Sequence, residues 1–263
     1  MHDIAFVVAG FVVGLIVGLT GVGGGSLMTP ILIFAFGVKP YLAVGTDLLF
    51  AAVTKAGGTV SLMKQRLVPW RVVGQLCAGS LPAALATLYV LHTVGPASPA
   101  VQKTMTTTLG VALLLTAAAV LYKALRGRQT TQATLAALGP EATRPRHWAL
   151  PVAFGAVIGT LVTLTSVGAG AIGVTALIIM FPLLPLPRIV AADIAYAVPL
   201  TLVAGLGHAS LGSVDWDLLA KLLAGSLPGI WLGSRLIHKA PERLLRSMLS
   251  VLLAYAGTKL MAI

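Results

Sequence analysis

The pentapeptide Ala78-Gly79-Ser80-Leu81-Pro82 recurs as Ala224-Gly225-Ser226-Leu227-Pro228, at an offset of 146 residues. At the same offset Asp47 matches Asp193, and Trp70 matches Trp216. The run 20–25 also matches 165–170, at an offset that is smaller by one. One extra residue between Pro182 and Pro187 accounts for this change of register. The repeat takes in nearly the whole sequence, which predicts a chain built from two related halves.

The composition predicts a multi-pass membrane protein. Hydrophobic residues make up 57% of the chain, charged residues only 10%, and the mean hydropathy is +0.97. A soluble domain carries about 25% charged residues, so this chain lacks the polar side chains to cover itself in water. Segments such as 72–91 have the roughly 20 residues that cross a bilayer core. Cys77 is the single cysteine, which excludes a disulfide framework and a cysteine metal site.

We predict an all-α polytopic fold with a first transmembrane repeat at 1–123, a cytoplasmic linker at 124–148 and a second repeat at 149–263. Each repeat contains five apolar segments, at 4–20, 26–37, 42–63, 71–93 and 103–123, and at 149–165, 171–184, 189–211, 217–237 and 242–261. In each half a glycine-rich break separates the first segment from a short second one. The length of this pair is compatible with a re-entrant hairpin and with two full spans.

The basic residues predict the orientation of the chain. The net charge is +11, but the basic residues sit at segment ends rather than on a patch of a soluble fold, which argues against nucleic-acid binding. If each glycine-broken pair is a hairpin, Lys39, Lys103, Lys221 and Lys259 fall outside and Lys55 falls within a span. That leaves 13 of the 18 basic residues in the cytoplasm. One crossing helix per pair would leave only ten inside, so the positive-inside rule favours inverted halves with both termini on the non-cytoplasmic side.

The two glycine breaks are candidate anion sites. Broken backbone exposes N–H groups at a helix start, where about half a positive elementary charge attracts anions. The predicted substrate-binding residues here are Gly21, Val22, Gly23, Gly24, Gly25, Ser26, Thr165, Ser166, Gly168 and Gly170. The alternative is that these glycines only permit close helix packing. That second interpretation is the one we give to the stripe of Gly10, Gly14 and Gly18.

Lys55 lies near the middle of a predicted span, where a charge costs on the order of 3 kcal/mol unless it is paired or hydrated. We expect it to neutralise an anionic substrate, with hydroxyl contacts from Thr46 and from Thr201, the repeat counterpart of Lys55. The alternatives are a structural ion pair and a side chain that reaches to the membrane interface.

Asp47 and Asp193 are related by the repeat and are candidates for proton coupling, although each is also suited to cap a helix start. His208 is expected to be structural. No catalytic motif and no group with metal-ligand spacing occurs, so we expect neither an enzyme nor a bound cofactor or metal.

The sequence resembles the sulfite exporter TauE/SafE family of bacterial permeases. The resemblance rests on the run Gly18-Leu19-Thr20-Gly21-Val22-Gly23-Gly24-Gly25 with Met28-Thr29-Pro30, on Val44-Gly45-Thr46, and on His208 with Gly212-Ser213-Val214-Asp215-Trp216. It implies a transporter in the bacterial inner membrane for small anions such as sulfite or organosulfonates. It also implies use of an ion gradient, for which H⁺ is the candidate coupling ion. The second half departs from the pattern, with Ala169 and Ala171 where the first has Gly24 and Ser26.

We therefore predict a secondary transporter that moves a small anion across the bacterial inner membrane by alternating access. Its expected partners are the anion, the coupling proton and the lipid bilayer. Two alternatives stay open. A passive anion channel would share the positive site without uphill accumulation, and a non-transporting membrane assembly partner would bind no anion.

Overall fold

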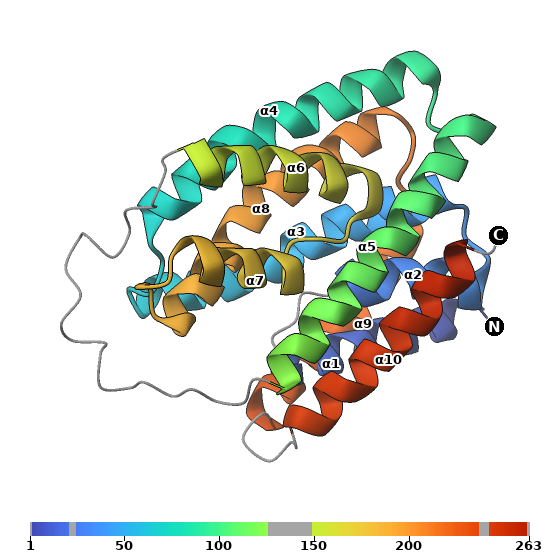
Figure 1. Cartoon of the computed structure of the whole chain (residues 1–263). Helices are drawn as coiled ribbons and strands as arrows, with labels where there is room; N and C mark the ends of the chain where they lie inside the picture. The colour runs from blue at the N-terminus through green and yellow to red at the C-terminus, as the bar shows by residue number, and fades with distance from the viewer. Residues whose placement is uncertain (1, 21–24, 126–148, 237–241, 262–263) are drawn as a thin grey trace.

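The structure, a computed structural model, describes residues 2–20, 25–125, 149–236 and 242–261. Over these residues the chain is all-helical, and its helices are α1 (His2–Thr20), α2 (Gly25–Phe36), α3 (Pro40–Lys64), α4 (Trp70–Val94), α5 (Pro99–Leu125), α6 (Ala149–Thr165), α7 (Ala171–Met180), α8 (Leu186–Ser210), α9 (Trp216–Leu236) and α10 (Glu242–Met261) (Figure 1). Each helix corresponds to one predicted segment. The predicted linker falls almost wholly at 126–148, outside the described residues.

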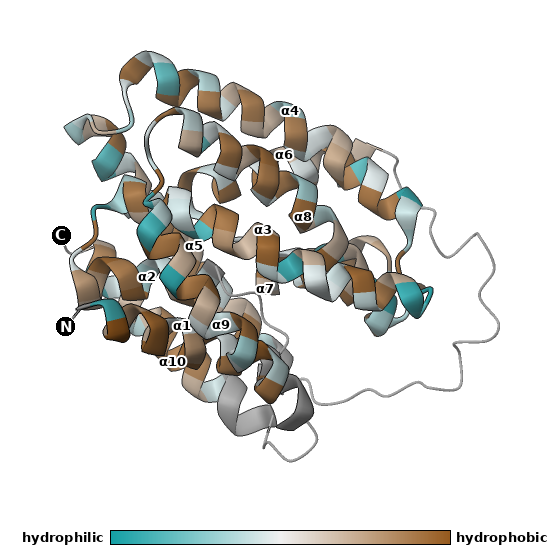
Figure 2. Cartoon of the chain, turned by 180° about the vertical axis from the view of Figure 1, so that it is seen from behind, coloured by the Kyte–Doolittle hydropathy of each residue, from teal (hydrophilic) through white to brown (hydrophobic). Residues whose placement is uncertain are grey.

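The outward faces of the helices are apolar. Large hydrophobic side chains lie exposed on α4, such as Leu85 and Tyr89, and on α10, such as Val251 and Tyr255. In Figure 2 brown, hydrophobic residues run over the outer helices. Helices α4 and α8, and α5 from Pro99 to Tyr122, are long and apolar enough to cross a membrane. Exposed surface of this kind is suited to lipid rather than water.

Glycines let helices from opposite halves approach closely. A Cβ on Gly10 or Gly14 of α1 would collide with the backbone oxygen of Leu222 or Ser226 in α9. The same collision recurs between α6 and α4, where Gly155 and Gly159 meet the backbone oxygens of Leu76 and Ser80. Both pairs of helices run parallel, and the residues in contact are related by the repeat. The packing interpretation of Gly10 and Gly14 is thereby confirmed; the side-chain position at Gly18 is not described.

The third and fifth helices of each half pack against their own counterparts. In α3 and α8, Gly45 lies beside His208 and Gly205 beside Leu49, so these helices run antiparallel. In α5 and α10, Gly110 approaches Gly257 while Ser250 donates a hydrogen bond to the Ala117 carbonyl at 2.9 Å. This pair is antiparallel as well.

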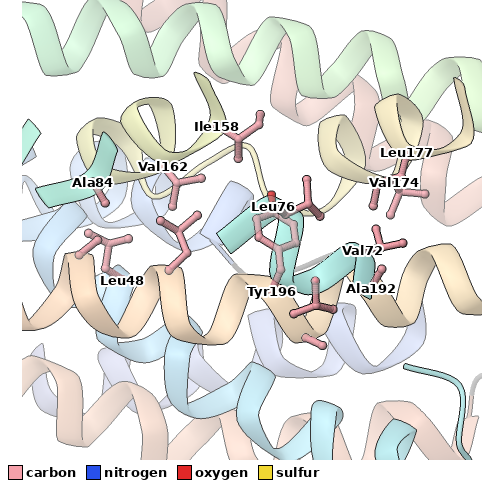
Figure 3. Close-up of a cluster of buried hydrophobic side chains, with 14 of the residues drawn as sticks. Leu48, Val72, Leu76, Ala84, Ile158, Val162, Val174, Leu177, Ala192 and Tyr196 are labelled. Atoms are coloured by element: carbon pink, nitrogen blue, oxygen red, sulfur yellow. The ribbon is translucent and has the colours of Figure 1, made fainter. Parts of the chain in front are cut away.

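Buried apolar side chains form two clusters, and each draws helices from both halves. One cluster, which includes Leu76, Ile158 and Tyr196, lies among α3, α4, α5, α6, α7 and α8 (Figure 3). The other lies among α1, α2, α3, α5, α9 and α10. Helices α3 and α5 contribute to both clusters and so connect them; α3 places Leu48 in the first and Phe50 in the second.

The ends of α1, α2 and α10 meet at one side of the molecule. The rings of Phe6 and Phe36 lie 4.6 Å apart, so α2 ends next to the start of α1. The Lys259 ammonium lies 5.2 Å from the centre of the Phe34 ring. The first helix pair therefore returns the chain to the side on which α1 begins.

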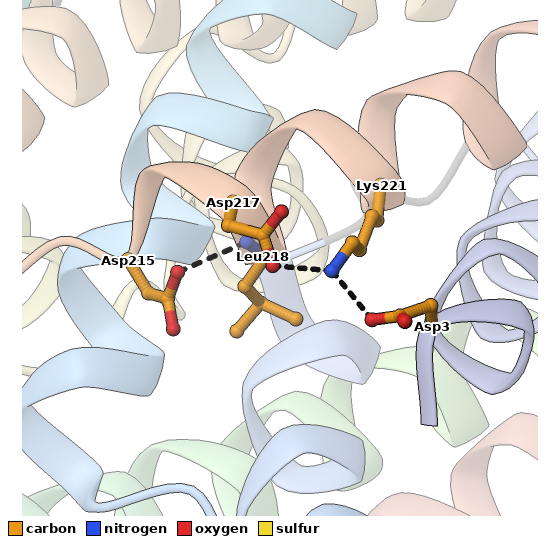
Figure 4. A network of polar contacts seen from close by, with 5 residues as sticks. All are labelled: Asp3, Asp215, Asp217, Leu218 and Lys221. Atoms are coloured by element: carbon orange, nitrogen blue, oxygen red, sulfur yellow. Dashed lines mark hydrogen bonds and ion pairs between the residues drawn. The ribbon is translucent and has the colours of Figure 1, made fainter. Parts of the chain in front are cut away.

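Lys221 joins the start of α1 to that of α9 by exposed ion pairs. It contacts Asp3 of α1 at 2.5 Å, and also Asp217 one turn earlier in its own helix (Figure 4). Exposed pairs of this kind contribute little to stability, so the glycine contacts hold α1 to α9.

Candidate functional site

The break between α6 and α7 is described in full and has an unusual backbone. Gly168 and Gly170 have φ angles of 132° and 133°, which residues with a side chain rarely adopt. Ser166 has a φ of 60°, a strained value for a residue with a side chain. The helical hydrogen-bond pattern of α6 nevertheless continues to Ser166, because its amide donates to the Val162 carbonyl at 2.7 Å.

The start of α7 has backbone amides that find no carbonyl partner among the described residues. The amides of Gly173 and Val174 donate to the carbonyls of Gly168 and Gly170, at 3.2 and 2.9 Å. The amides of 168–172 donate to no backbone carbonyl of another described residue. A helix start with unused donors attracts negative charge, as the sequence predicts for this break.

Lys55 reaches this break from the first half of the chain. It is half-buried in α3, and its ammonium donates to the Ala169 carbonyl at 3.4 Å. The structural ion-pair interpretation of Lys55 stays a prediction. The Lys55 charge does interact electrostatically with Asp47 and Asp193.

Asp47 is fully buried beside the same break. Its Oδ2 accepts a hydrogen bond from the Thr29 hydroxyl at 2.5 Å, which ties α3 to α2. Among the described residues its Oδ1 has no hydrogen-bond partner, and neither does the Ser166 hydroxyl that interacts with this carboxylate. Two polar atoms that are buried together without partners are typical of a place where a proton, water or ligand binds.

Asp193 lies in α8 and also interacts electrostatically with Lys55. Its carboxylate packs against Gly173 at the start of α7, where a Cβ would collide with Oδ1. The buried Tyr196 hydroxyl interacts with Asp193 and forms no hydrogen bond to another described residue. The repeat counterpart of Tyr196 is Phe50, so the two halves present different chemistry to the centre.

The capping interpretation of the two aspartates is wrong. Helix α3 begins at Pro40 and α8 at Leu186, so Asp47 and Asp193 lie well inside their helices. Each helix instead has a proline in its first turn, where the fixed φ of that residue suits the helix. The carboxylates therefore lie at the level of the break and not at a helix start.

The predicted threonine hydroxyls are engaged with backbone. The Thr165 hydroxyl accepts a hydrogen bond from the Val167 amide at 3.1 Å. It donates its own hydrogen to the Leu161 carbonyl at 2.6 Å. Thr46 accepts from the Asp215 amide at 3.0 Å, and Thr201 donates to the Ala197 carbonyl at 2.8 Å. These bonds leave each hydroxyl less available to a substrate.

In the first half the structure describes only part of the predicted site. Gly21, Val22, Gly23 and Gly24 lie outside the described residues. Gly25 begins α2, and Ser26 is buried in its first turn. Ser26, Thr46 and Thr201 are all buried, and the hydrogen bonds described above for the two threonines go to backbone and not to Lys55.

Two contributors could not be identified from the sequence. Thr29 belongs to the Met28-Thr29-Pro30 motif, but its bond to Asp47 depends on how α2 folds onto α3. Ala169 takes part through its backbone carbonyl, which no side-chain pattern reveals.

Ten described helices with apolar outer faces around a buried charged centre define a multi-pass membrane protein, and comparison with known proteins specifies its class. The chain belongs to the sulfite exporter TauE/SafE family, whose model matches residues 6–260. This is a family of membrane transporters.

Three curated relatives from Bacillus subtilis (strain 168) are similar over almost their whole length. "Probable membrane transporter protein YjnA" is 35% identical, covering 98% of this chain and 99% of the relative. "Probable membrane transporter protein YdhB" is 26% identical over 95% and 97%, and "Probable membrane transporter protein YunE" 25% over 99% and 97%. No solved structure matches the chain.

Proposed function

We propose that this protein is a secondary transporter that moves a small anion, sulfite or an organosulfur anion, across the bacterial inner membrane. The observation that carries the proposal is the position of Lys55, whose ammonium lies on the α6–α7 break beside the unused amides of α7. A buried cation next to a positive helix start is suited to an oxyanion. The family description names sulfite, which supports a sulfur oxyanion as substrate.

The charges around Lys55 support proton coupling. If Lys55, Asp47 and Asp193 are all ionised, the centre carries one positive and two negative charges and repels an anion. One proton on either carboxylate makes the trio neutral, and a second makes it positive. The anion therefore binds together with protons, and both move in the same direction.

A proton suits this site better than Na⁺ as the coupling ion. In transporters with broken helices, the backbone carbonyls of the unwound segments coordinate Na⁺. Here the carbonyls at 168, 169 and 170 each accept a hydrogen bond already, from the Gly173 amide, the Lys55 ammonium and the Val174 amide, in that order. The Lys55 charge would also repel a metal cation.

Alternating access follows from the proposed arrangement of the halves. Two halves related by a two-fold axis in the membrane plane can exchange conformations, so that one site faces either side in turn. The antiparallel packing of α3 on α8 and of α5 on α10 supports such inverted repeats. Together with the positive-inside rule, it supports a topology with both termini outside the cytoplasm.

The test is flux into proteoliposomes that contain the purified protein. Sulfite, thiosulfate, sulfoacetate, acetate and chloride are compared with and without an imposed pH gradient. We expect saturable, gradient-dependent accumulation of one sulfur anion. Downhill flux that never becomes uphill would indicate a passive channel. No flux and no binding of any anion would reject the proposal in favour of an assembly partner.

A further inference from the structure

His208 is a buried titratable residue that the proposed transport step does not use. It lies in the last turn of α8 with none of its surface exposed. Its Nε2 lies 2.9 Å from the carbonyl of Thr163, in the last turn of α6. A carbonyl only accepts hydrogen bonds, so the imidazole carries its hydrogen on Nε2 and donates it.

The Thr163 carbonyl needs this donor because α6 ends early. Inside a helix the amide of residue 167 would bond to it, but the Val167 amide donates to the Thr165 hydroxyl instead. His208 therefore satisfies a carbonyl at the point where the chain leaves α6 and enters the break. It acts as a C-terminal cap that comes from another helix.

His208 also joins this point to the region around Asp47. Its own carbonyl accepts from the Ser213 amide at 2.9 Å, and its Cβ packs against Gly45 of α3. Two residues further along the same loop, the Asp215 amide donates to Thr46, the neighbour of Asp47. A short chain of contacts therefore links the end of α6 to Asp47.

We propose that His208 is a positioning residue, which caps α6 and thereby sets where the break presents Ser166 and Ala169 to Asp47 and Lys55. This inference rests on the proposed function of the break. The imidazole acts as a neutral donor: among the described residues, no charged side chain of α3, α6 or the α8–α9 loop interacts with it. The first half has Leu62 at the corresponding position, and a leucine side chain cannot donate such a hydrogen bond.

The test compares His208→Gln with His208→Asn in the full-length protein. The glutamine amide nitrogen can occupy the place of Nε2, whereas the asparagine amide reaches only as far as Nδ1. We expect His208→Gln to keep the KM for sulfite and the pH profile of flux. His208→Asn should raise KM on the order of tenfold while kcat changes less, as when a supporting contact of a binding site is lost.

Two results overturn the inference. A wild-type KM in His208→Asn would mean that the cap does not position the site. A changed pH profile or lost proton coupling in His208→Gln would make the imidazole a proton carrier instead. Size-exclusion elution and thermal unfolding establish that each variant is folded.

A second readout does not depend on any transported anion. In a Cys77→Ser background, a cysteine placed at Ala169 is alkylated by a small maleimide. We expect His208→Asn to change the alkylation rate several-fold and His208→Gln to leave it unchanged. Equal rates in both would reject the positioning role even if the protein moved no sulfite, so the two proposals fail separately.

Discussion

The ammonium of Lys55 donates a hydrogen bond to the carbonyl of Ala169, 114 residues away in the chain. A cation from the first half is thus held on the broken backbone of the second half. The repeat counterpart of Lys55 is Thr201, which bonds to its own helix, so this cation has no equivalent. The site is asymmetric although the helices around it are duplicated.

Replacing Lys55 tests whether this cation binds the substrate. Lys55→Met keeps an unbranched apolar stem and removes the charge. We expect the Kd for sulfite to rise at least tenfold, since a hydrogen bond to a charged group contributes about 1.5–3 kcal/mol. Isothermal titration with the purified protein measures the change. Lys103→Met, on the exposed face of α5, is the matched control; equal affinity in both variants would remove Lys55 from the site.

Asp47→Asn tests the proton-coupling role. The amide can still accept from Thr29, but it no longer binds and releases a proton. We expect sulfite to bind as well as or better than in the wild type, because one negative charge beside Lys55 is gone. Uphill accumulation driven by a pH gradient should be lost, with only downhill exchange left.

A pH-sensitive dye inside the vesicles records whether protons accompany the anion. Asp217→Asn, at an exposed carboxylate of α9, controls for a general effect of lost charge. Asp193→Asn shows which carboxylate carries the proton. Normal acidification of the lumen by the Asp47 variant would exclude Asp47 as the carrier.

Two substitutions of Ser166 test its backbone strain and the role of its hydroxyl separately. Its φ of 60° costs about 1 kcal/mol or more for a residue with a side chain, and glycine would remove that cost. We expect Ser166→Gly to unfold at the same or a higher temperature than the wild type. Ser166→Ala keeps the strain and should gain nothing.

Both variants lack the hydroxyl beside Asp47, so both should show weaker proton-coupled flux. Thermal unfolding and flux are measured on the same preparations. If Ser166→Gly keeps full coupled flux, the hydroxyl has no part in the proton step.

The sequence was sufficient to predict where the helices lie in the chain, but not which helices pack against one another. Ten apolar segments and two glycine breaks could be predicted, because membrane spans need long apolar runs and the repeat marks the ends of these runs. In a soluble protein the apolar stripe of a helix also tells which face is buried. Here nearly every face is apolar, so the packing of α1 on α9 and of α4 on α6 had to come from the structure.

The same limit applies to the site. Lys55 and Asp47 stood out because a charge in a span is costly. Their partners are a threonine on another helix and a backbone carbonyl, and neither residue type is rare enough to be noticed. The first break, at 21–24, remains a prediction.

The glycine contacts that hold opposite halves together are tested by two substitutions on one helix. A Cβ at Gly79 would collide with the backbone of Val152 in α6, whereas Gly74, one turn earlier in α4, has nothing within 4 Å of that position. We expect Gly79→Ala to destabilise the protein by about 1–3 kcal/mol, as overpacking does, and to lower its unfolding temperature in detergent. Gly74→Ala should be neutral or stabilising by up to about 1 kcal/mol, because alanine favours the helix. By the repeat, Gly225→Ala should behave like Gly79→Ala, since its Cβ would meet the backbone of Val7. Equal unfolding temperatures for the Gly74 and Gly79 variants would mean that α4 and α6 are not packed this closely.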